Sequence, residues 1–271
     1  GDEIGAGYTG FLWPLYLDQL KKDGHNKAWS NLLANLNLKI NNVDQISNFI
    51  NAGIENQKNY GVCTSDGQKI LKNSLINNSY EKKNDNGPPI YPKDFESYLQ
   101  NSQYIELFHT KLPRGLRYVD RASSASGREA RVPLLTKEIV EFCFAIPNNF
   151  KIRDGELRWF MKKSMKYITK NFINLKNKRS VADPQRDWLR KDFKTIVFKL
   201  FNSRTFGNRG IFNQKEVVKY YEYFLKKKDA HSLGIFQIFI TEIWLRLFID
   251  SKPSYFKDAK LDEFIYETNK F

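Results

Sequence analysis

Apolar residues recur at the spacing of an α-helix along most of this 271-residue chain. Three such stripes occupy the first 60 residues, each with a period near 3.6 residues. Their members are Leu12, Leu15, Tyr16 and Leu20, then Trp29, Leu32, Leu33, Leu36 and Ile40, then Val43, Ile46, Phe49, Ile50 and Ile54. No convincing continuous strand interrupts the pattern, so the sequence predicts a mainly α-helical protein.

The last third of the chain predicts three further helices, over about 190–205, 213–228 and 231–249. The last of them carries an aromatic-rich stripe that is expected to be packed in the core, which is far more common than a cofactor site. The stripe consists of Phe236, Ile240, Ile243, Trp244, Leu247 and Phe248.

Polar residues mark the ends of two helices in the middle of the chain. Thr136 is a plausible N-cap with Glu138 in the first turn behind it, and Pro147 ends that helix. Asp154 is expected to cap the next helix, with Arg158 in its second turn reaching back toward the loop. The clearest loop, Lys82 to Pro92, could link two parts of the chain.

Composition indicates a globular chain, since 41% of residues are hydrophobic and 15% aromatic. No apolar run approaches the roughly 20 residues that span a bilayer, and no signal segment opens the chain. We therefore expect no membrane partner. Cys63 and Cys143 are too few for a disulfide framework or a zinc site, and they suit a reducing cytoplasm.

The net charge of +14 admits nucleic-acid binding, but the lysines are scattered and no arginine-rich stripe has interleaved aromatics. The chain is rich in Lys, Asn, Ile, Phe and Tyr together, which are residues of A/T-rich codons. A skewed genome would raise the lysine content without selection for phosphate binding, so a nucleic-acid partner is disfavoured. A small anionic substrate such as a nucleotide also suits a positive field.

The segment from Asp120 to Leu135 combines small residues with closely spaced charges. Residues 123–127, ending at Gly127, leave the backbone nearly bare, so another group can approach it closely. Glu129 and Arg131 follow, just before an apolar Val-Pro-Leu-Leu run. Two interpretations stay open: a structural ion pair that closes a joint between helices, or a functional loop.

The first eight residues form a glycine-rich acidic motif, Gly-Asp-Glu-Ile-Gly-Ala-Gly-Tyr. It is typical of a strand end that turns through a tight loop into a helix. Asp2 could meet a metal-bound phosphate there, since hard divalent cations take carboxylate oxygens. Alternatively, Asp2 and Glu3 merely favour the positive end of the following helix.

Taken together, these segments resemble the C-terminal synthetase domain of the asparagine synthetase family, which includes β-lactam synthetase. Residues 1–8 are similar to the family's G-[AS]-D-E-[LV]-F-G-G-Y, with the similarity beginning inside the motif and not at its first position. Residues 120–135 resemble D-R-x-S-M-A-x-[SG]-x-E-x-R-x-P-F-L-D, and residues 151–158 resemble K-x-R-x-G-x-x-K. Later landmarks match around Pro184 to Leu189 and Gly210 to Asn213.

The resemblance implies an α/β domain of the pyrophosphate-loop (adenine nucleotide α-hydrolase-like) type, of which this chain is the helical C-terminal part. It implies a ligase that uses ATP and Mg²⁺ to adenylate a carboxylate, which ammonia from a glutamine-hydrolysing N-terminal domain then converts to an amide. Asp2 corresponds to the family's metal ligand and Arg158 to its catalytic lysine. Glu129, Arg131 and Gly127 correspond to the loop beside the acceptor, with Glu129 also a candidate catalytic residue.

Several positions depart from the family pattern. Its S-G-G-x-D-S phosphate loop is not found in these residues, so we expect this segment alone to be inactive. Arg158 replaces a lysine, while Thr136 and Leu134 replace an aspartate and an aromatic residue. The acceptor is therefore open: aspartate, or another acid such as a sugar uronate. A non-catalytic helical interaction module is the alternative.

The expected organisation has four parts. Residues 1–10 end the α/β core with the acidic loop, and residues 11–110 form a variable helical segment. Residues 111–190 line the active site, and residues 191–271 form the C-terminal helices.

Overall fold

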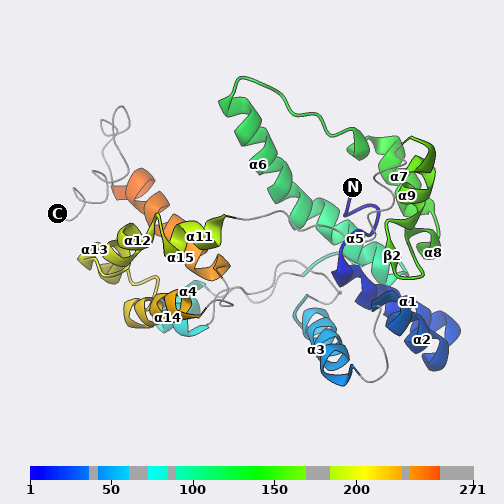
Figure 1. The fold of residues 1–271 in the computed structure, drawn as a ribbon, viewed down its shortest axis with the longest axis horizontal. Helices are drawn as coiled ribbons and strands as arrows, with labels where there is room; N and C mark the ends of the chain where they lie inside the picture. Colours follow the sequence, from blue (N-terminus) through cyan, green and yellow to red (C-terminus); the bar gives the residue numbers. More distant parts are fainter. Residues whose placement is uncertain (37–41, 61–72, 85–89, 169–183, 228–231, 251–271) are drawn as a thin grey trace. The chain divides into compact units, whose positions relative to one another are not determined.

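The computed structural model describes residues 1–36, 42–60, 73–84, 90–168, 184–227 and 232–250. These residues form mainly α-helices, as the apolar stripes predicted, together with one short hairpin (Figure 1). The chain divides into two compact units. Unit 1 comprises residues 1–68 and 87–178, and unit 2 comprises residues 69–86 and 179–271.

Unit 1 opens with helices built on the three N-terminal stripes. They are η1 (Thr9–Phe11), α1 (Leu12–Asp23), α2 (His25–Leu36) and α3 (Val43–Tyr60). Helix α1 packs against α2, α3 and α5 (Tyr98–Phe108), and its buried side chains Leu12 and Leu15 join Leu32 and Leu99 in one core. Ile40 of the second stripe lies outside the described residues.

The rest of unit 1 runs from α6 to a short 3₁₀ turn. Its elements are α6 (Lys111–Ala125), η3 (Pro133–Leu135), α7 (Lys137–Ala145), α8 (Asn148–Lys151), β1 (Ile152–Arg153), β2 (Glu156–Leu157), α9 (Trp159–Ser164) and η4 (Met165–Tyr167). No residue of α6 is buried, and its C-terminal half extends away from the other helices of the unit (Figure 1).

One carboxylate fastens three helices of unit 1 together. Asp18 on α1 accepts hydrogen bonds from the backbone N–H groups of Tyr98 and Leu99 at 2.7 and 3.1 Å, at the start of α5. It also accepts one from Asn148 Nδ2 on α8 at 3.0 Å. An anion at a helix N-terminus satisfies otherwise orphaned donors and opposes the helix dipole. Asp18 therefore sets the positions of α5 and α8.

The segment around Asp154 differs from the sequence prediction. Asp154 and Gly155 have φ of +51° and +75° and join β1 to β2, whose register pairs Arg153 with Glu156. Two positive φ angles are what a two-residue hairpin turn of type I′ requires, and Asp-Gly is a favoured pair for it. The expectation that Asp154 caps a helix is therefore wrong, and Arg158 occupies the N-cap position of α9 instead of its second turn.

Helix α7 begins close to where the sequence predicted. Thr136 has the extended backbone of an N-cap, and Glu138 lies in the first turn. However, the Thr136 side chain makes no capping hydrogen bond. The position is therefore confirmed and the capping contact is not.

Unit 2 is helical throughout its described residues. Its elements are η2 (Asn73–Leu75), α4 (Asn78–Asn84), α11 (Gln185–Arg190), α12 (Lys194–Phe201), α13 (Arg204–Asn208), α14 (Gln214–Lys226), α15 (Leu233–Leu245) and a π-helical turn (Arg246–Asp250). The single helix expected over 190–205 is divided, because Ser203 caps α13 by accepting from Phe206 N at 3.3 Å.

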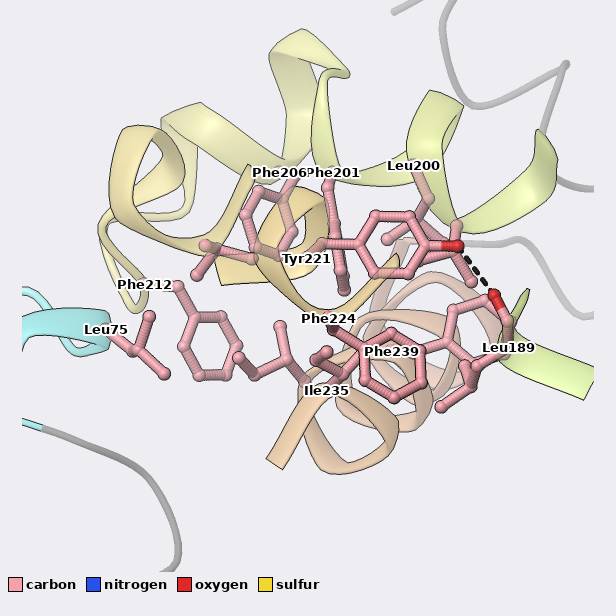
Figure 2. Packing of buried hydrophobic residues seen from close by; sticks show 13 residues of the cluster. Leu75, Leu189, Leu200, Phe201, Phe206, Phe212, Tyr221, Phe224, Ile235 and Phe239 are labelled. Carbon is pink, nitrogen blue, oxygen red and sulfur yellow. Dashed lines mark hydrogen bonds between the residues drawn. The ribbon is translucent and has the colours of Figure 1, made fainter. Parts of the chain in front are cut away.

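Aromatic residues fill the core of unit 2. Figure 2 shows Phe201, Phe206 and Tyr221 packed together, with the Tyr221 hydroxyl donating to the carbonyl of Leu189 at 2.7 Å. Leu75 from η2 and Phe212 belong to the same cluster (Figure 2). Residues 73–75 are thereby tied to the C-terminal helices, although they precede them by more than a hundred positions.

The buried face of α15 is not the one that its aromatic stripe suggested. Ile235, Ile238 and Phe239 are buried, together with Glu242 and then Arg246. Ile240, Trp244 and Phe248 are exposed within the described structure, while Phe236 and Ile243 are partly buried against the core. The prediction is wrong for Ile240, Trp244 and Phe248. The buried face instead includes Glu242 and Arg246, two charged residues whose burial is tolerated because they pair with each other.

That charged pair belongs to a larger network. Arg246 Nε donates to Glu242 Oε1 at 2.8 Å, and Arg209 Nε donates to Glu242 Oε2 at 2.6 Å. Arg246 also donates to Ser203 Oγ at 2.7 Å, and Arg209 pairs with Asp250. Both oxygens of one buried carboxylate are thus satisfied by guanidinium groups.

Among the helices described, none has the length and apolar character needed to cross a membrane.

Candidate functional site

The two strongest candidates, Asp2 and Arg158, meet in unit 1. Arg158 Nη1 lies 3.0 Å from Asp2 Oδ1, and the side chains are 31% and 21% exposed, respectively. Asp2 lies in the N-terminal loop, and Arg158 follows directly after β2. The chain fold therefore brings together two candidates that lie near opposite ends of the unit in sequence.

Glycine at position 7 makes this approach possible. The loop turns through two backbone hydrogen bonds, from Gly5 N to Gly1 O at 2.9 Å and from Gly7 N to Asp2 O at 2.7 Å. A Cβ on Gly7 would lie 2.8 Å from Asp2 Cγ and 2.9 Å from Arg158 Cδ. Since ordinary contacts begin near 3.4 Å, only a bare backbone fits between these side chains.

Arg158 is held in an unusual backbone conformation. Its φ and ψ are +59° and +35°, in the left-handed region that non-glycine residues seldom adopt. Such a conformation costs on the order of 1 kcal/mol or more, and it persists only where the surroundings enforce it. Moreover, Arg158 Nε is buried and has no hydrogen-bond partner among the described residues. The guanidinium thus faces the acidic loop with an unused donor.

Tyr8 lies at the other end of the loop, among acidic groups. Its hydroxyl donates to Glu3 Oε1 at 2.6 Å, and Lys111 Nζ lies 3.5 Å from the centre of its ring. Burial, and then the hydrogen bond to Glu3 and the nearby carboxylates, raise the pKa of Tyr8 well above its usual value. Tyr8 is therefore a neutral hydrogen-bond donor at any physiological pH.

The backbone of the loop is held from behind by Gln103 of α5. Its side-chain amide is fully buried, and Nε2 donates to the carbonyls of Glu3 at 2.9 Å and Ile4 at 2.7 Å. Gln103 is not recognisable as a site residue from the sequence, because nothing in its local pattern distinguishes it from other polar residues of a helix.

Glu129 and Arg131 form a second pair. Arg131 Nη2 donates to Glu129 Oε2 at 3.1 Å, and the side chains are 82% and 73% exposed. No hydrogen bond or ion pair joins them to Asp2 or Arg158 in the part of the chain that the structure describes. The ion pair itself is confirmed, but its exposure contradicts the interpretation in which it closes a joint between helices.

Gly127 precedes this pair with φ of +64°, and a Cβ there would meet nothing within 4 Å. The end of the same motif does reach the acidic loop. A Cβ on Gly1 would lie 3.0 Å from Leu134 Cδ1, and Leu135 packs against the buried cluster that includes Ile4. Any role of Gly127, Glu129 and Arg131 toward a substrate stays a prediction.

The donor set at Asp2 and Arg158 fits a metal-bound phosphate group better than a bare metal ion. Among the described residues, no group of three His, Cys, Asp or Glu side chains could hold a metal by itself. Mg²⁺ commonly takes only one or two protein carboxylates and completes its shell with water and phosphate oxygens. A carboxylate beside a guanidinium matches that combination, since Asp2 suits the cation and Arg158 suits the phosphate.

Fold and site together define a mainly α-helical protein in which an acidic, glycine-rich loop is paired with an arginine that directly follows a short hairpin. Comparison with known proteins agrees: the asparagine synthase family model matches residues 1–246. This chain belongs to the asparagine synthase family, as its motifs suggested.

One relative is asparagine synthetase [glutamine-hydrolyzing] 1 of Bacillus subtilis (strain 168). It is 23% identical over 158 residues, which cover 58% of this chain and 24% of that protein. The aligned part of the chain thus spans about a quarter of the curated relative. No solved structure matches this chain.

Proposed function

We propose that the full-length protein is an ATP-dependent ligase, which adenylates a carboxylate and converts the acyl-adenylate to an amide. Family membership supports the reaction class. The name of the Bacillus relative, a glutamine-hydrolysing asparagine synthetase, supports glutamine as the nitrogen source, supplied through a glutaminase domain. In this proposal the ATP-binding α/β core of the pyrophosphate-loop type is formed with residues outside the described helices.

The pairing of Asp2 with Arg158 is the observation that carries the proposal. When an acceptor carboxylate attacks the α-phosphate of ATP, negative charge grows on the departing pyrophosphate. The partly exposed guanidinium of Arg158 can stabilise that charge with charge-assisted hydrogen bonds. Asp2 would hold Mg²⁺, which neutralises phosphate charge when bound.

Arginine at position 158 changes how this stabilisation works. A lysine offers a compact charge with three rotating donors, whereas arginine offers a rigid planar fork. The fork is anchored on one side by Asp2 at 3.0 Å. We infer that Arg158 shares its donors between Asp2 and a phosphate oxygen, which a lysine at this backbone position would do less well.

Glu129, Arg131 and Gly127 are proposed to contact the acceptor. Their support is the match to the family motif, and their high exposure leaves the Glu129 and Arg131 side chains accessible to a ligand. An exposed carboxylate and guanidinium side by side could bind an amino acid through both its charged groups, or a uronate through Arg131 alone. The assay described below distinguishes aspartate from a uronate as the acceptor.

The test is a pyrophosphate-release assay on the full-length protein, with glutamine or ammonium as nitrogen source and aspartate or a uronic acid as acceptor. We expect acceptor-dependent release, and we expect Arg158→Ala to lower kcat by about a hundredfold or more, as loss of a transition-state donor does. Arg153→Ala is the matched control, since Arg153 lies on the same hairpin and is exposed. Unchanged turnover in Arg158→Ala would instead favour the non-catalytic helical module.

A further inference from the structure

A fully buried lysine lies behind the acidic loop, outside the pair that the proposed function uses. Lys151 ends α8, and its Nζ donates to Gln103 Oε1 at 3.0 Å. The ring of Phe144 lies 5.7 Å away, and no ion pair to Lys151 is found among the described residues. Burying an ammonium group with a neutral partner is costly, so the arrangement calls for an explanation.

The groups around Lys151 do not remove the free-energy cost of burying its ammonium. Two ionisable groups act electrostatically on Lys151: the thiol of Cys143 on α7 and the carboxylate of Asp18 on α1. Burial raises the pKa of Cys143, so the thiol carries no compensating charge near neutral pH. Burial also lowers the pKa of Lys151 to about 8. The ammonium is therefore tolerated rather than stabilised by its surroundings.

The contact with Gln103 gives Lys151 a specific task. A glutamine amide has one accepting end and one donating end, and the two can exchange by rotation. The charged ammonium group of Lys151 can only donate, so it requires Oε1 to face it. This orientation turns Nε2 toward the carbonyls of Glu3 and Ile4, at 2.9 and 2.7 Å. If the Gln103 amide were rotated, Oε1 would face the carbonyl oxygens of Glu3 and Ile4, and these oxygens would repel one another.

The same chain of contacts joins both halves of the candidate site. Glu3 and Ile4 directly follow Asp2 in the loop. Lys151 directly precedes β1, the strand whose hairpin returns to Arg158. Lys151 and Gln103 thus form a buried brace between the segment that carries the carboxylate and the segment that carries the guanidinium.

We propose that Lys151 is a positioning residue, which acts through Gln103 to hold the loop that places Asp2 against Arg158. The proposal rests on the proposed function, in which that pair contacts pyrophosphate. Lys151 itself touches neither Asp2 nor Arg158 among the contacts described. Its effect on the reaction is indirect and passes through the loop backbone.

The first test needs no activity. Hydrogen–deuterium exchange of the full-length protein reports on the amides of Gly5 and Gly7, which donate to Gly1 and Asp2 within the loop. We expect faster exchange there in Lys151→Met. We expect the same in Gln103→Glu, which still accepts from Lys151 and so should fold, but cannot donate to the two carbonyls. Unchanged exchange in a folded variant overturns the proposal.

The second test is kinetic. In the pyrophosphate-release assay, Lys151→Met and Gln103→Glu should lower kcat by about tenfold with KM nearly unchanged, as sub-ångström misplacement does. In an Asp2→Asn background the same changes should have no further effect, because the group that they position is already lost. An equal loss in that background indicates a merely structural role and overturns the proposal.

A control separates positioning from general destabilisation. Arg246→Met removes another fully buried cation, but in unit 2, and should leave exchange at Gly5 and Gly7 unchanged. If the wild-type protein releases no pyrophosphate under any condition, the proposed function fails. The exchange experiment then still decides whether Lys151 orders the loop.

Discussion

Gly7→Ala should separate Asp2 from Arg158 with the smallest possible change. The added Cβ would lie 2.8 Å from Asp2 Cγ and 2.9 Å from Arg158 Cδ, where ordinary contacts start near 3.4 Å. Asp2 Oδ1 would lie closer still, so the carboxylate must retreat by more than half an ångström and Arg158 Cδ by about half an ångström, and the pair must open or shift as a unit. Misplacement of a catalytic group by about 1 Å can cost on the order of a hundredfold in rate, so we expect kcat to fall by about ten- to a hundredfold.

The assay is acceptor-dependent pyrophosphate release by the full-length protein, with thermal unfolding recorded in parallel. Gly115→Ala is the control, because Gly115 lies within α6 and a Cβ there meets nothing within 4 Å. Alanine should suit that helix better by up to about 1 kcal/mol and leave kcat unchanged. A folded Gly7→Ala protein with wild-type kcat and KM would refute the argument that the Asp2–Arg158 contact supports the reaction.

Three further predictions concern stability, measured by urea unfolding. Glu242→Gln should destabilise unit 2 by about 3–5 kcal/mol, because it leaves the buried guanidinium of Arg246 without its carboxylate; a loss below 1 kcal/mol would contradict this. Lys151 has a folded pKa of about 8 against an ordinary 10.5, so the unfolded chain binds more protons between these values. Wild type should therefore gain stability relative to Lys151→Met, by up to about 1.4 kcal/mol per pH unit, as pH rises from 8 toward 10.5; a pH-independent difference would count against it. Arg131→Ala should change stability by less than about 0.5 kcal/mol, since its pair with Glu129 is exposed; a larger loss would show that the pair supports the fold.

Local patterns in the sequence predicted a large part of the fold. The stripes around Leu12, Leu32 and Ile46 became α1, α2 and α3, because helical periodicity depends only on neighbours within a few turns. The motifs also identified the family that comparison then confirmed. The motifs also predict Asp2 and Arg158 as site residues, each from its own motif and without indicating that the two meet.

Predictions from local patterns are wrong where the same residues are compatible with two structures. Asp154 is a suitable helix N-cap, but Asp154-Gly155 is also a favoured hairpin turn, and the turn prevailed. In α15 the helical spacing of the apolar residues predicts that Ile240 and Trp244 are in the core, but both are exposed. The helix instead buries Glu242, because Arg209 and Arg246 from either side of it in the chain neutralise the charge.

By itself, then, the sequence determined the helical class, the family and the identity of the charged residues worth testing. The tertiary structure alone decided which of those residues meet. It paired Asp2 with Arg158, left Glu129 and Arg131 on the surface, and buried Lys151 against Gln103. The physical reason is that periodicity and motifs record local backbone preference, whereas a contact between distant residues depends on every turn and packed face between them.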